Sequence, residues 1–281
     1  MAESPIAGPN EMPTESTPST PTLSTDVPQT ARIWNYLLGG TDNYPVDRAV
    51  GDEIIKATPE LVDIARLSRA YLARVVRYLA GEAGIRQFLD IGTGLPTANN
   101  THEVAQAIAP GSRIVYVDND PLVLTHARAL LTSSPEGMTA YVDADLREPE
   151  KILAAPELRD TLDLTQPVAL MLVATLHFIT EQDDPYAIVQ RLLGALPPGS
   201  YLAISHATSD YLPPELVADI TSGRHGQGRL RTEAEITRFF AGLELIPPGV
   251  APVAEWRAEH EPQPRPAAAE TGMFAGLARL A

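Results

Sequence analysis

The hydrophobic residues of this chain follow two different spacings. Between residues 30 and 80 they recur every three or four positions, as on the inner face of amphipathic helices. Farther along, short uninterrupted apolar runs alternate with further helical stretches. Five of these runs predict strands, at residues 87–91, 113–117, 139–142, 168–174 and 200–205. This alternation predicts an α/β fold with a mainly parallel sheet, preceded by helices.

The C-terminal part of the chain departs from that alternation. Thr232 to Glu235 form a capping box for a helix through Phe240. Apolar segments at 243–246 and 273–278 predict an antiparallel hairpin at the sheet edge, and the prolines of the long connection at 247–271 indicate irregular structure. We therefore expect a sheet of seven strands.

The same patterns predict the organisation of domains. We expect a single domain over residues 29–281, made of a helical cap over 29–82 and an α/β core over 83–281. Residues 1–28 are rich in Pro, Thr and Ser and have few large apolar groups, which predicts a disordered tail, or one that orders only on a partner. The chain shows no secretion signal and no apolar run near the roughly 18 residues needed to cross a bilayer, so we expect a cytoplasmic protein.

Composition narrows the expected partners. The 281 residues carry a formal net charge of -15 and include no cysteine. This charge argues against a nucleic-acid partner and against an anionic membrane surface. The lack of cysteine excludes thiolate metal sites and cysteine nucleophiles, and no His, Asp and Glu cluster has metal-ligand spacing, so we expect no metal. A small molecule is the expected partner, and a homodimer remains open.

Two segments carry the strongest chemical signal. Residues 87–97 run from an apolar strand into a glycine turn, and residues 114–118 form a second apolar strand that ends in a carboxylate. On a parallel sheet, a glycine turn followed by an acid one strand later is typical of a nucleoside-cofactor site, although a glycine turn also serves simple chain reversal. The candidate cofactor-binding residues here are Asp90, Gly92, Thr93, Gly94, Asp118 and Asn119.

Two departures from the dinucleotide pattern favour a different nucleoside. Thr97 stands where the third glycine of that pattern belongs, and Asp90 lies at the mouth of the turn, where its charge would repel a pyrophosphate. S-adenosylmethionine has no phosphate and carries a sulfonium and an ammonium group. A carboxylate at this strand end can therefore help to bind its aminoacyl half.

A third strand end extends the pattern. Asp145 and Leu146 follow the apolar run at 139–142, at the place where methyltransferases of this fold flank the adenine. An Asp there commonly accepts a hydrogen bond from the exocyclic amine of the adenine. Acidic residues after strands are also ordinary turn residues.

Several separated phrases resemble the S-adenosyl methyltransferase family, a class I, Rossmann-like group once catalogued as a domain of unknown function. The matching segments are residues 31–44, 87–97, 115–121, 176–178 and 205–207. This resemblance implies a Rossmann-like fold and S-adenosyl-L-methionine as the cofactor, with the N-terminal helices covering it. Tyr36 and Asn43, on either side of a Gly-Gly link, are accordingly expected to contact the cofactor. The alternative for this link is a helix C-cap followed by an Asx turn.

Residues after the fourth and fifth strands are expected to face the reacting methyl group. These include Ala174, as a cofactor contact, and the candidate catalytic residues His177 and His206. A neutral imidazole could take the proton of a hydroxyl acceptor, although a histidine at a strand end is often structural. Residues 224–228 are expected to form a mobile loop, with a substrate lid as the alternative.

Together these features predict an S-adenosylmethionine-dependent methyltransferase that acts on a small molecule, more at oxygen than at nitrogen. Two other classes stay open. One is a regulatory protein that binds S-adenosylmethionine or S-adenosylhomocysteine without turnover. The other, less favoured, is an NAD(P)-dependent oxidoreductase.

Overall fold

The computed structural model describes residues 25–130, 133–222 and 228–281. Most of the N-terminal tail and all but one residue of the 224–228 loop therefore lie outside the described residues. The sheet is built from these strands: β1 (Gln87–Ile91), β2 (Arg113–Asp118), β3 (Met138–Asp143), β4 (Ala169–Val173), β5 (Tyr201–Ala207), β6 (Glu244–Leu245), β7 (Ala251–Pro252) and β8 (Met273–Arg279).

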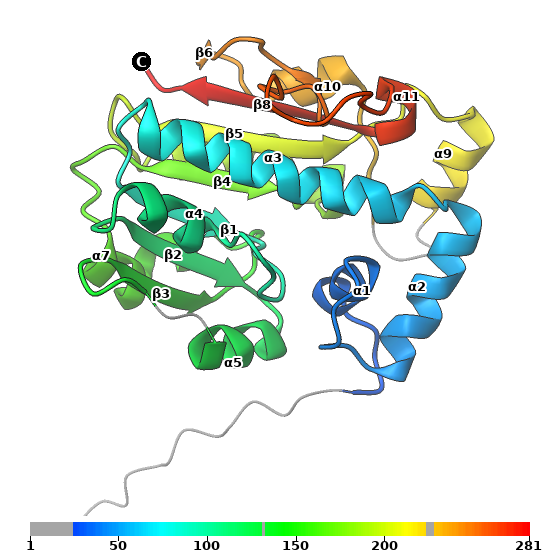
Figure 1. The fold of residues 1–281 in the computed structure, drawn as a ribbon, viewed down its shortest axis with the longest axis horizontal. Helices are drawn as coiled ribbons and strands as arrows, with labels where there is room; N and C mark the ends of the chain where they lie inside the picture. The colour runs from blue at the N-terminus through cyan, green and yellow to red at the C-terminus, as the bar shows by residue number, and fades with distance from the viewer. Residues whose placement is uncertain (1–24, 131–132, 223–227) are drawn as a thin grey trace, which may run out of the picture.

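The strand order is β3-β2-β1-β4-β5-β8-β6, and β7 also pairs with β8 (Figure 1). Strands β1 to β5 are parallel, whereas β8 runs antiparallel to β5, β6 and β7. The order reverses between β1 and β4, and ligands bind at such a reversal in open parallel sheets. The predicted mainly parallel sheet with an antiparallel edge is confirmed.

Two details of the edge differ from the prediction. An additional two-residue strand, β7, lies within the connection expected to be irregular, so the sheet has eight strands instead of seven. Two residues are too short to show an alternating pattern in the sequence. The predicted hairpin pairing exists between β6 and β8, but β8 lies between β5 and β6 within the sheet.

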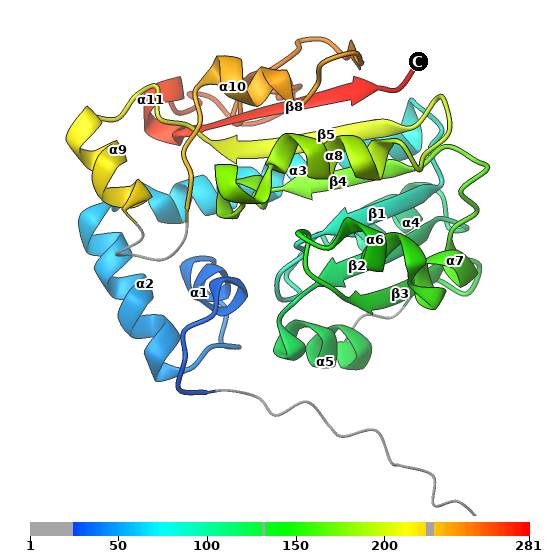
Figure 2. The same ribbon diagram turned by 180° about the vertical axis from the view of Figure 1, so that it is seen from behind.

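Helices cover both faces of the sheet. On one face lie α3 (Leu61–Gly81) and α4 (Thr101–Ile108) (Figure 1), and on the other lie α6 (Pro149–Ala154), α7 (Pro156–Thr161) and α8 (Pro185–Leu193) (Figure 2). Helix α5 (Pro121–Leu130) lies beside β3, and the chain after β5 adds α9 (Pro214–Thr221), α10 (Glu233–Arg238) and α11 (Ala268–Thr271). Among the described residues, no helix combines the length and apolar character that a membrane crossing requires.

Successive strand residues divide the core between the two faces. Phe88 belongs to the apolar cluster that contains Leu79 of α3, whereas Leu89 belongs to the cluster that contains Val189 of α8. All four side chains are almost fully buried. A strand buried on both faces requires an uninterrupted apolar run, which explains the pattern seen in the sequence.

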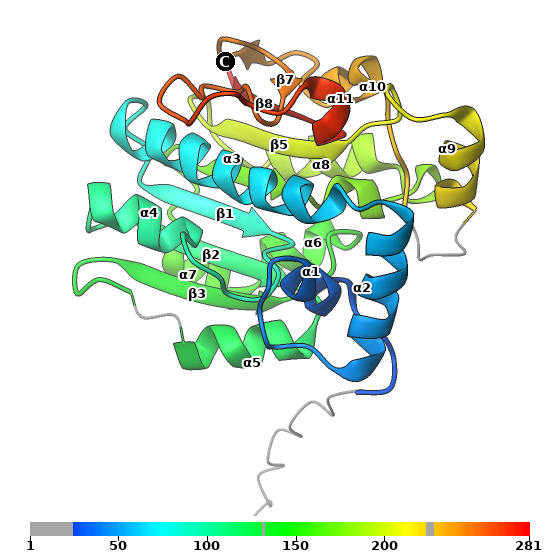
Figure 3. The same cartoon turned by 45° about the vertical axis from the view of Figure 1, so that its right-hand side comes forward.

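The N-terminal helices α1 (Thr30–Leu37) and α2 (Pro45–Ala57) lie at the carboxyl ends of the strands. Figure 3 shows α1 beyond the arrowheads of β1 and β2. The buried guanidinium of Arg32 lies 3.6 Å from a carboxylate oxygen of Asp47 in α2 and 3.6 Å from one of Asp120, just after β2. These ion pairs fix α1 to α2 and to the end of the sheet.

Candidate active site

A cavity of about 230 Å³ lies between α1 and the carboxyl ends of the parallel strands. It brings together most of the residues predicted to bind the cofactor. Its lining includes Asp90, Gly92, Thr93, Gly94, Asp118, Asn119, Asp145, Leu146 and Ala174. These residues come from four strand ends, so the structure places nine separate sequence positions around one space.

The glycine turn after β1 lets the backbone form one side of this cavity. Gly92 and Gly94 have φ values of +74° and +64°, which side chains with a Cβ rarely adopt. A Cβ added to Gly92 would lie 2.5 Å from the Thr175 side chain. Glycine at position 92 is thus required by backbone conformation and by close contact with the end of β4.

Asp118 is held at the end of β2 by backbone donors. Its two carboxylate oxygens accept hydrogen bonds from the N–H of Gly94, at 2.9 Å, and from the N–H of Asp120, at 3.0 Å. Burial raises the pKa of Asp118 to about 6. The glycine turn and the β2 carboxylate therefore form one connected unit at the cavity wall.

Asp90 is the second buried carboxyl group of the cavity. The hydroxyl of Thr101, at the start of α4, donates to its Oδ2 at 2.6 Å. Burial raises the pKa of Asp90 to about 6, although the Thr101 hydrogen bond and the charge of Arg69 act in the opposite direction. A cationic ligand would stabilise the ionised form of both Asp90 and Asp118.

The end of β3 contributes a polar cluster at the cavity. Asn119 donates to Asp145 at 2.7 Å, and Arg147 forms an ion pair with the same carboxylate at 2.9 Å. Arg147 also donates to the carbonyl of Phe178 at 3.1 Å. Leu146 is buried beside this cluster, so the region combines an apolar surface with polar groups.

Backbone strain occurs at the end of β4. Ala174 has a φ of +56°, in the left-handed region that residues with a Cβ seldom occupy. Its N–H is directed at Ser205 of β5, with the carbonyl at 3.1 Å and the hydroxyl at 3.0 Å. Such a conformation typically costs about 1–3 kcal/mol and is concentrated at functional sites.

Tyr36 and Asn43 are not among the residues that line the cavity, so their contact with the cofactor stays a prediction that this placement does not support. The Tyr36 hydroxyl donates to Asp52 of α2 at 2.6 Å. Asn43 donates to Asn35 at 3.0 Å and to the carbonyl of Gly40 at 2.9 Å. The polar groups of the α1–α2 link thus bond to one another, and the helix C-cap of the alternative is present: Gly39 has a φ of +80°, and the N–H of Gly40 donates to the carbonyl of Asn35 at 2.8 Å.

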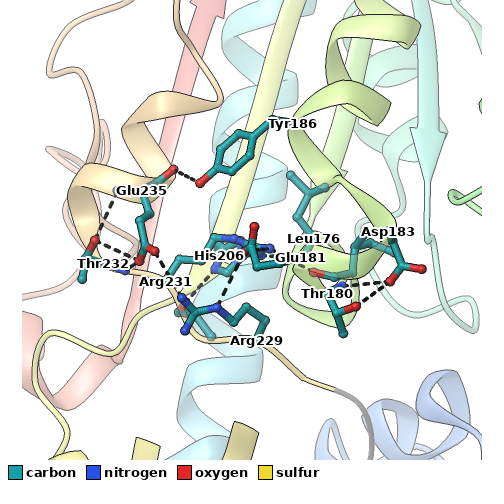
Figure 4. A network of polar contacts seen from close by, with 12 residues as sticks. Leu176, Thr180, Glu181, Asp183, Tyr186, His206, Arg229, Arg231, Thr232 and Glu235 are labelled. Carbon is teal, nitrogen blue, oxygen red and sulfur yellow. Dashed lines mark hydrogen bonds and ion pairs between the residues drawn. The ribbon is translucent and has the colours of Figure 1, made fainter.

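His177 and His206 also lie outside the cavity lining. Both side chains are buried next to the fully buried Arg231, whose guanidinium donates to His206 Nε2 at 2.8 Å and to the carbonyls of Leu176 and Ile179 at 3.0 Å (Figure 4). A fourth hydrogen bond joins Arg231 to Glu181 at 2.8 Å. The structure therefore places both imidazoles beside Arg231 and not in the cavity lining.

The hydrogen bonds of His206 show which of its ring nitrogens carries the hydrogen. A guanidinium only donates, so Nε2 of His206 accepts from Arg231, and Nδ1 must donate to the carbonyl of Ala207 at 2.7 Å. Burial lowers the pKa of His206 well below its usual value, and burial and the charge of Arg231 lower the pKa of His177 to about 4. Their assignment as catalytic residues stays a prediction that this placement does not support.

Several cavity residues were not predicted from the sequence. They are Trp34, Leu38, Ser68, Arg69, Leu72, Arg147, Phe178 and Ile179. One signal was present in the sequence: Arg69 lies four residues after Ala65 and three before Leu72, so a charged residue falls on the apolar face of α3. Among the described residues, no three His, Asp or Glu side chains are grouped as a metal site would require.

The fold and the cavity together define a class of protein. A mainly parallel sheet with an antiparallel β8, and a carboxylate-lined cavity at the strand ends, are features of class I, Rossmann-like methyltransferases. The chain belongs to the S-adenosyl methyltransferase family, whose model matches residues 16–281.

Individual relatives agree with this assignment. A crystal structure of a DUF574-family protein from Streptomyces avermitilis has 48% identity and a TM-score of 0.85, over 92% of this chain and 99% of that one. The crystal structure of a candidate methyltransferase from Thermobifida fusca has 45% identity and a TM-score of 0.82, and the match covers 90% of this chain and 95% of that one. A candidate S-adenosyl-L-methionine-dependent methyltransferase of Mycobacterium marinum has 27% identity over 243 residues, covering 80% of this chain and 68% of that protein.

The cavity residues fit S-adenosyl-L-methionine, the cofactor of the family. The buried carboxyl groups of Asp90 and Asp118 suit a cationic ligand with ribose hydroxyls, and they would oppose the pyrophosphate of a dinucleotide. Arg69 also has a buried Nε with no hydrogen-bond partner in the described part of the chain. The protein is thus an S-adenosylmethionine-dependent methyltransferase.

Proposed function

We propose that this enzyme methylates a small molecule, at an oxygen atom that is already ionised at neutral pH. Carboxylic acids and acidic phenols are the acceptors of this class. The observation that carries the proposal is the lining of the cavity, where α1 covers the strand ends and the titratable side chains among the described residues are only Asp and Arg.

The chemistry needs little proton transfer from the protein. When bound, S-adenosylmethionine supplies an electrophilic methyl group, which an oxygen anion can accept once it is correctly positioned. His, Lys and Tyr are absent from the described cavity lining, and Asp90 and Asp118 are assigned to the cofactor. An acceptor that arrives deprotonated therefore suits this cavity better than an alcohol or a protonated amine.

We assign Asp118 to the ribose hydroxyls, with Gly92, Thr93 and Gly94 as the backbone cradle. Asn119, Asp145 and Leu146 are assigned to the adenine, and Asp90 and Ala174 to the aminoacyl half. The unassigned apolar residues Trp34, Leu38, Leu72, Phe178 and Ile179 offer a surface for the carbon skeleton of the acceptor. A helix across the strand ends also supports a small acceptor over a macromolecule.

The test is label transfer from S-adenosylmethionine with a labelled methyl group to a panel of carboxylic acids, phenols, alcohols and amines. We expect labelled product from the acids or phenols. Treatment with alkali separates the two, because methyl esters hydrolyse while aryl methyl ethers and N-methyl groups survive. Label found only on amines, proteins or nucleic acids would refute the proposal. Cofactor binding without transfer to any extract would favour the regulatory alternative.

A further inference from the structure

Arg69 holds a position that the assignments above leave unexplained. It lies on α3, whose other inward-facing residues are mostly core, and it lines the cavity together with Asp90 and Gly94. The same three residues line a smaller adjoining recess, with Thr101 and Tyr116. A guanidinium is therefore built into the end of the cavity where the glycine turn and Asp90 meet.

The guanidinium of Arg69 is held in place by hydrogen bonds, but not all of its donors are used. Its Nη2 donates to the carbonyls of Ala98 and Asn99, at 3.3 and 3.2 Å, and to Asn100 Oδ1 at 3.4 Å. Its Nε is buried and has no partner within the described residues. Buried donors are rarely left unpaired, because burial removes their hydrogen bonds to water. An oriented group with one unused donor indicates a ligand that supplies the acceptor.

The charge beside Arg69 identifies that ligand. Asp90 is close enough for its charge to raise the pKa of Arg69, which burial lowers. Even so, within the described ranges no ion pair of 4.0 Å or less joins Arg69 to Asp90, whose Oδ2 is bonded to Thr101 instead. Two opposite charges that are held near each other without pairing complement an α-amino acid, which carries an ammonium and a carboxylate on one carbon.

We propose that Arg69 binds the carboxylate of the amino-acid end of the cofactor, opposite Asp90, and so makes the cavity selective for adenosyl compounds that carry an intact α-amino acid. The inference rests on S-adenosylmethionine as the cofactor and is independent of the acceptor. Adenosyl thioethers that lack the amino acid are bound without this contact.

Calorimetric titration with two ligands tests the inference. S-adenosylhomocysteine carries the amino acid, and 5′-methylthioadenosine shares its adenosyl thioether but has no amino acid. We expect Arg69→Gln to weaken binding of S-adenosylhomocysteine by roughly 10- to 100-fold, as for the loss of a hydrogen bond to a charged group, and to change binding of 5′-methylthioadenosine by less than about threefold.

Two further variants act as controls. Arg69→Lys keeps the charge without the planar donor set, so its loss for S-adenosylhomocysteine should be smaller than that of Arg69→Gln. It also serves if Arg69→Gln fails to fold. Arg66→Gln removes an exposed arginine one turn earlier on the same helix, whose partner is Asp63, and should leave the affinity for both ligands unchanged.

The outcomes separate this inference from the function proposed above. Equal losses for both ligands, or an unchanged affinity for S-adenosylhomocysteine, would overturn the role of Arg69 alone and leave it as a tether for residues 98–100. A wild-type protein that binds neither ligand would overturn the cofactor assignment and this inference with it. Failure to methylate an acidic acceptor would leave the binding result intact.

Discussion

Two clusters of buried polar side chains lie at carboxyl ends of strands in the same sheet, with β4 between them, and they differ in the bonding capacity that they leave free. At the ends of β1 and β2, Asp90 and Asp118 receive hydrogen bonds and still line the cavity. At the end of β5, His206 uses both ring nitrogens, and Arg231 bonds to the segment after β4. Burial and polarity alone do not distinguish these clusters.

The two clusters differ in whether their charged groups are already paired within the protein. In the first cluster the hydrogen-bond donors are backbone amides and one hydroxyl, and within the described residues neither carboxylate forms an ion pair, so both can interact with a cationic ligand. In the second cluster a permanent cation is compensated by carbonyls and Glu181. One cluster is therefore suited to binding, and the other holds the segment after β4 in place.

The largest expected effect is on stability. Arg231→Gln removes a buried cation and leaves the carbonyls of Leu176 and Ile179 without their donor, so unfolding free energy should fall by about 3–5 kcal/mol in urea denaturation. Arg229→Gln is the matched control. Its partly exposed guanidinium pairs with Glu235 at 3.2 Å, and its loss should cost less than about 1 kcal/mol. Similar losses in both variants would contradict the structural role of Arg231.

The next effect concerns the cofactor. Asp118→Ala should weaken binding of S-adenosylhomocysteine by about 1.5–3 kcal/mol, as expected for hydrogen bonds to a charged group, measured by calorimetry. Asp143→Ala is the control, because Asp143 pairs with Asp118 in the register of β2 and β3 but is exposed. If Asp118→Ala binds like the wild type, our assignment of the ribose site is wrong.

A smaller effect follows from pH. The pKa of Asp90 and of Asp118 is about 6, so both carboxyl groups become protonated in the free protein near pH 5. A cationic ligand favours their ionised forms. Affinity for S-adenosylmethionine should therefore fall roughly tenfold per carboxyl group between pH 7 and pH 5. Asp118→Asn should show a shallower pH dependence, and an identical one would exclude Asp118 from the linkage.

The same groups affect folding in the opposite sense. Their pKa values in the folded state lie above the ordinary value of 3.8, so the folded protein binds more protons between about pH 4 and pH 6. Their contribution to the stability of the ligand-free protein consequently decreases as pH rises through this range. Bound cofactor should offset that decrease.

The smallest expected effect tests the histidine hypothesis. His177→Leu replaces a buried imidazole whose Nδ1 has no hydrogen-bond partner in the described structure, so affinity for S-adenosylhomocysteine should stay within about twofold. Label transfer to an acidic acceptor should persist as well. Loss of transfer with unchanged cofactor binding would instead restore the catalytic role that the sequence suggested.

Local patterns were sufficient for most of the fold. The predicted first strand agrees with β1 at both ends, because an uninterrupted apolar run is bounded by a clear glycine turn. The predicted capping box at Thr232 to Glu235 is present at the start of α10, where the Thr232 side chain accepts a hydrogen bond from the N–H of Glu235. The short helices α6 and α7 were not predicted, since six residues contain too little periodicity to detect.

The site was predictable only where its residues follow strands along the chain. Asp90 and Asp118 occupy positions fixed by the order of β1 and β2, so sequence spacing located them. The contact between His206 and Arg231 could not be predicted, because the two residues are 25 positions apart in the chain and no local pattern shows that pairing. Arg69 was missed because its helix precedes the sheet, and only packing brings it to Asp90.

The position of β8 has a consequence for synthesis on the ribosome. This strand is the last of the eight along the chain, but it pairs with β5, β6 and β7. Until residues 273–279 have been translated, β5 presents an unpaired edge, and β6 and β7 have no neighbour in the sheet. A nascent chain that stalls before this point therefore exposes an open sheet edge to chaperones or to other chains.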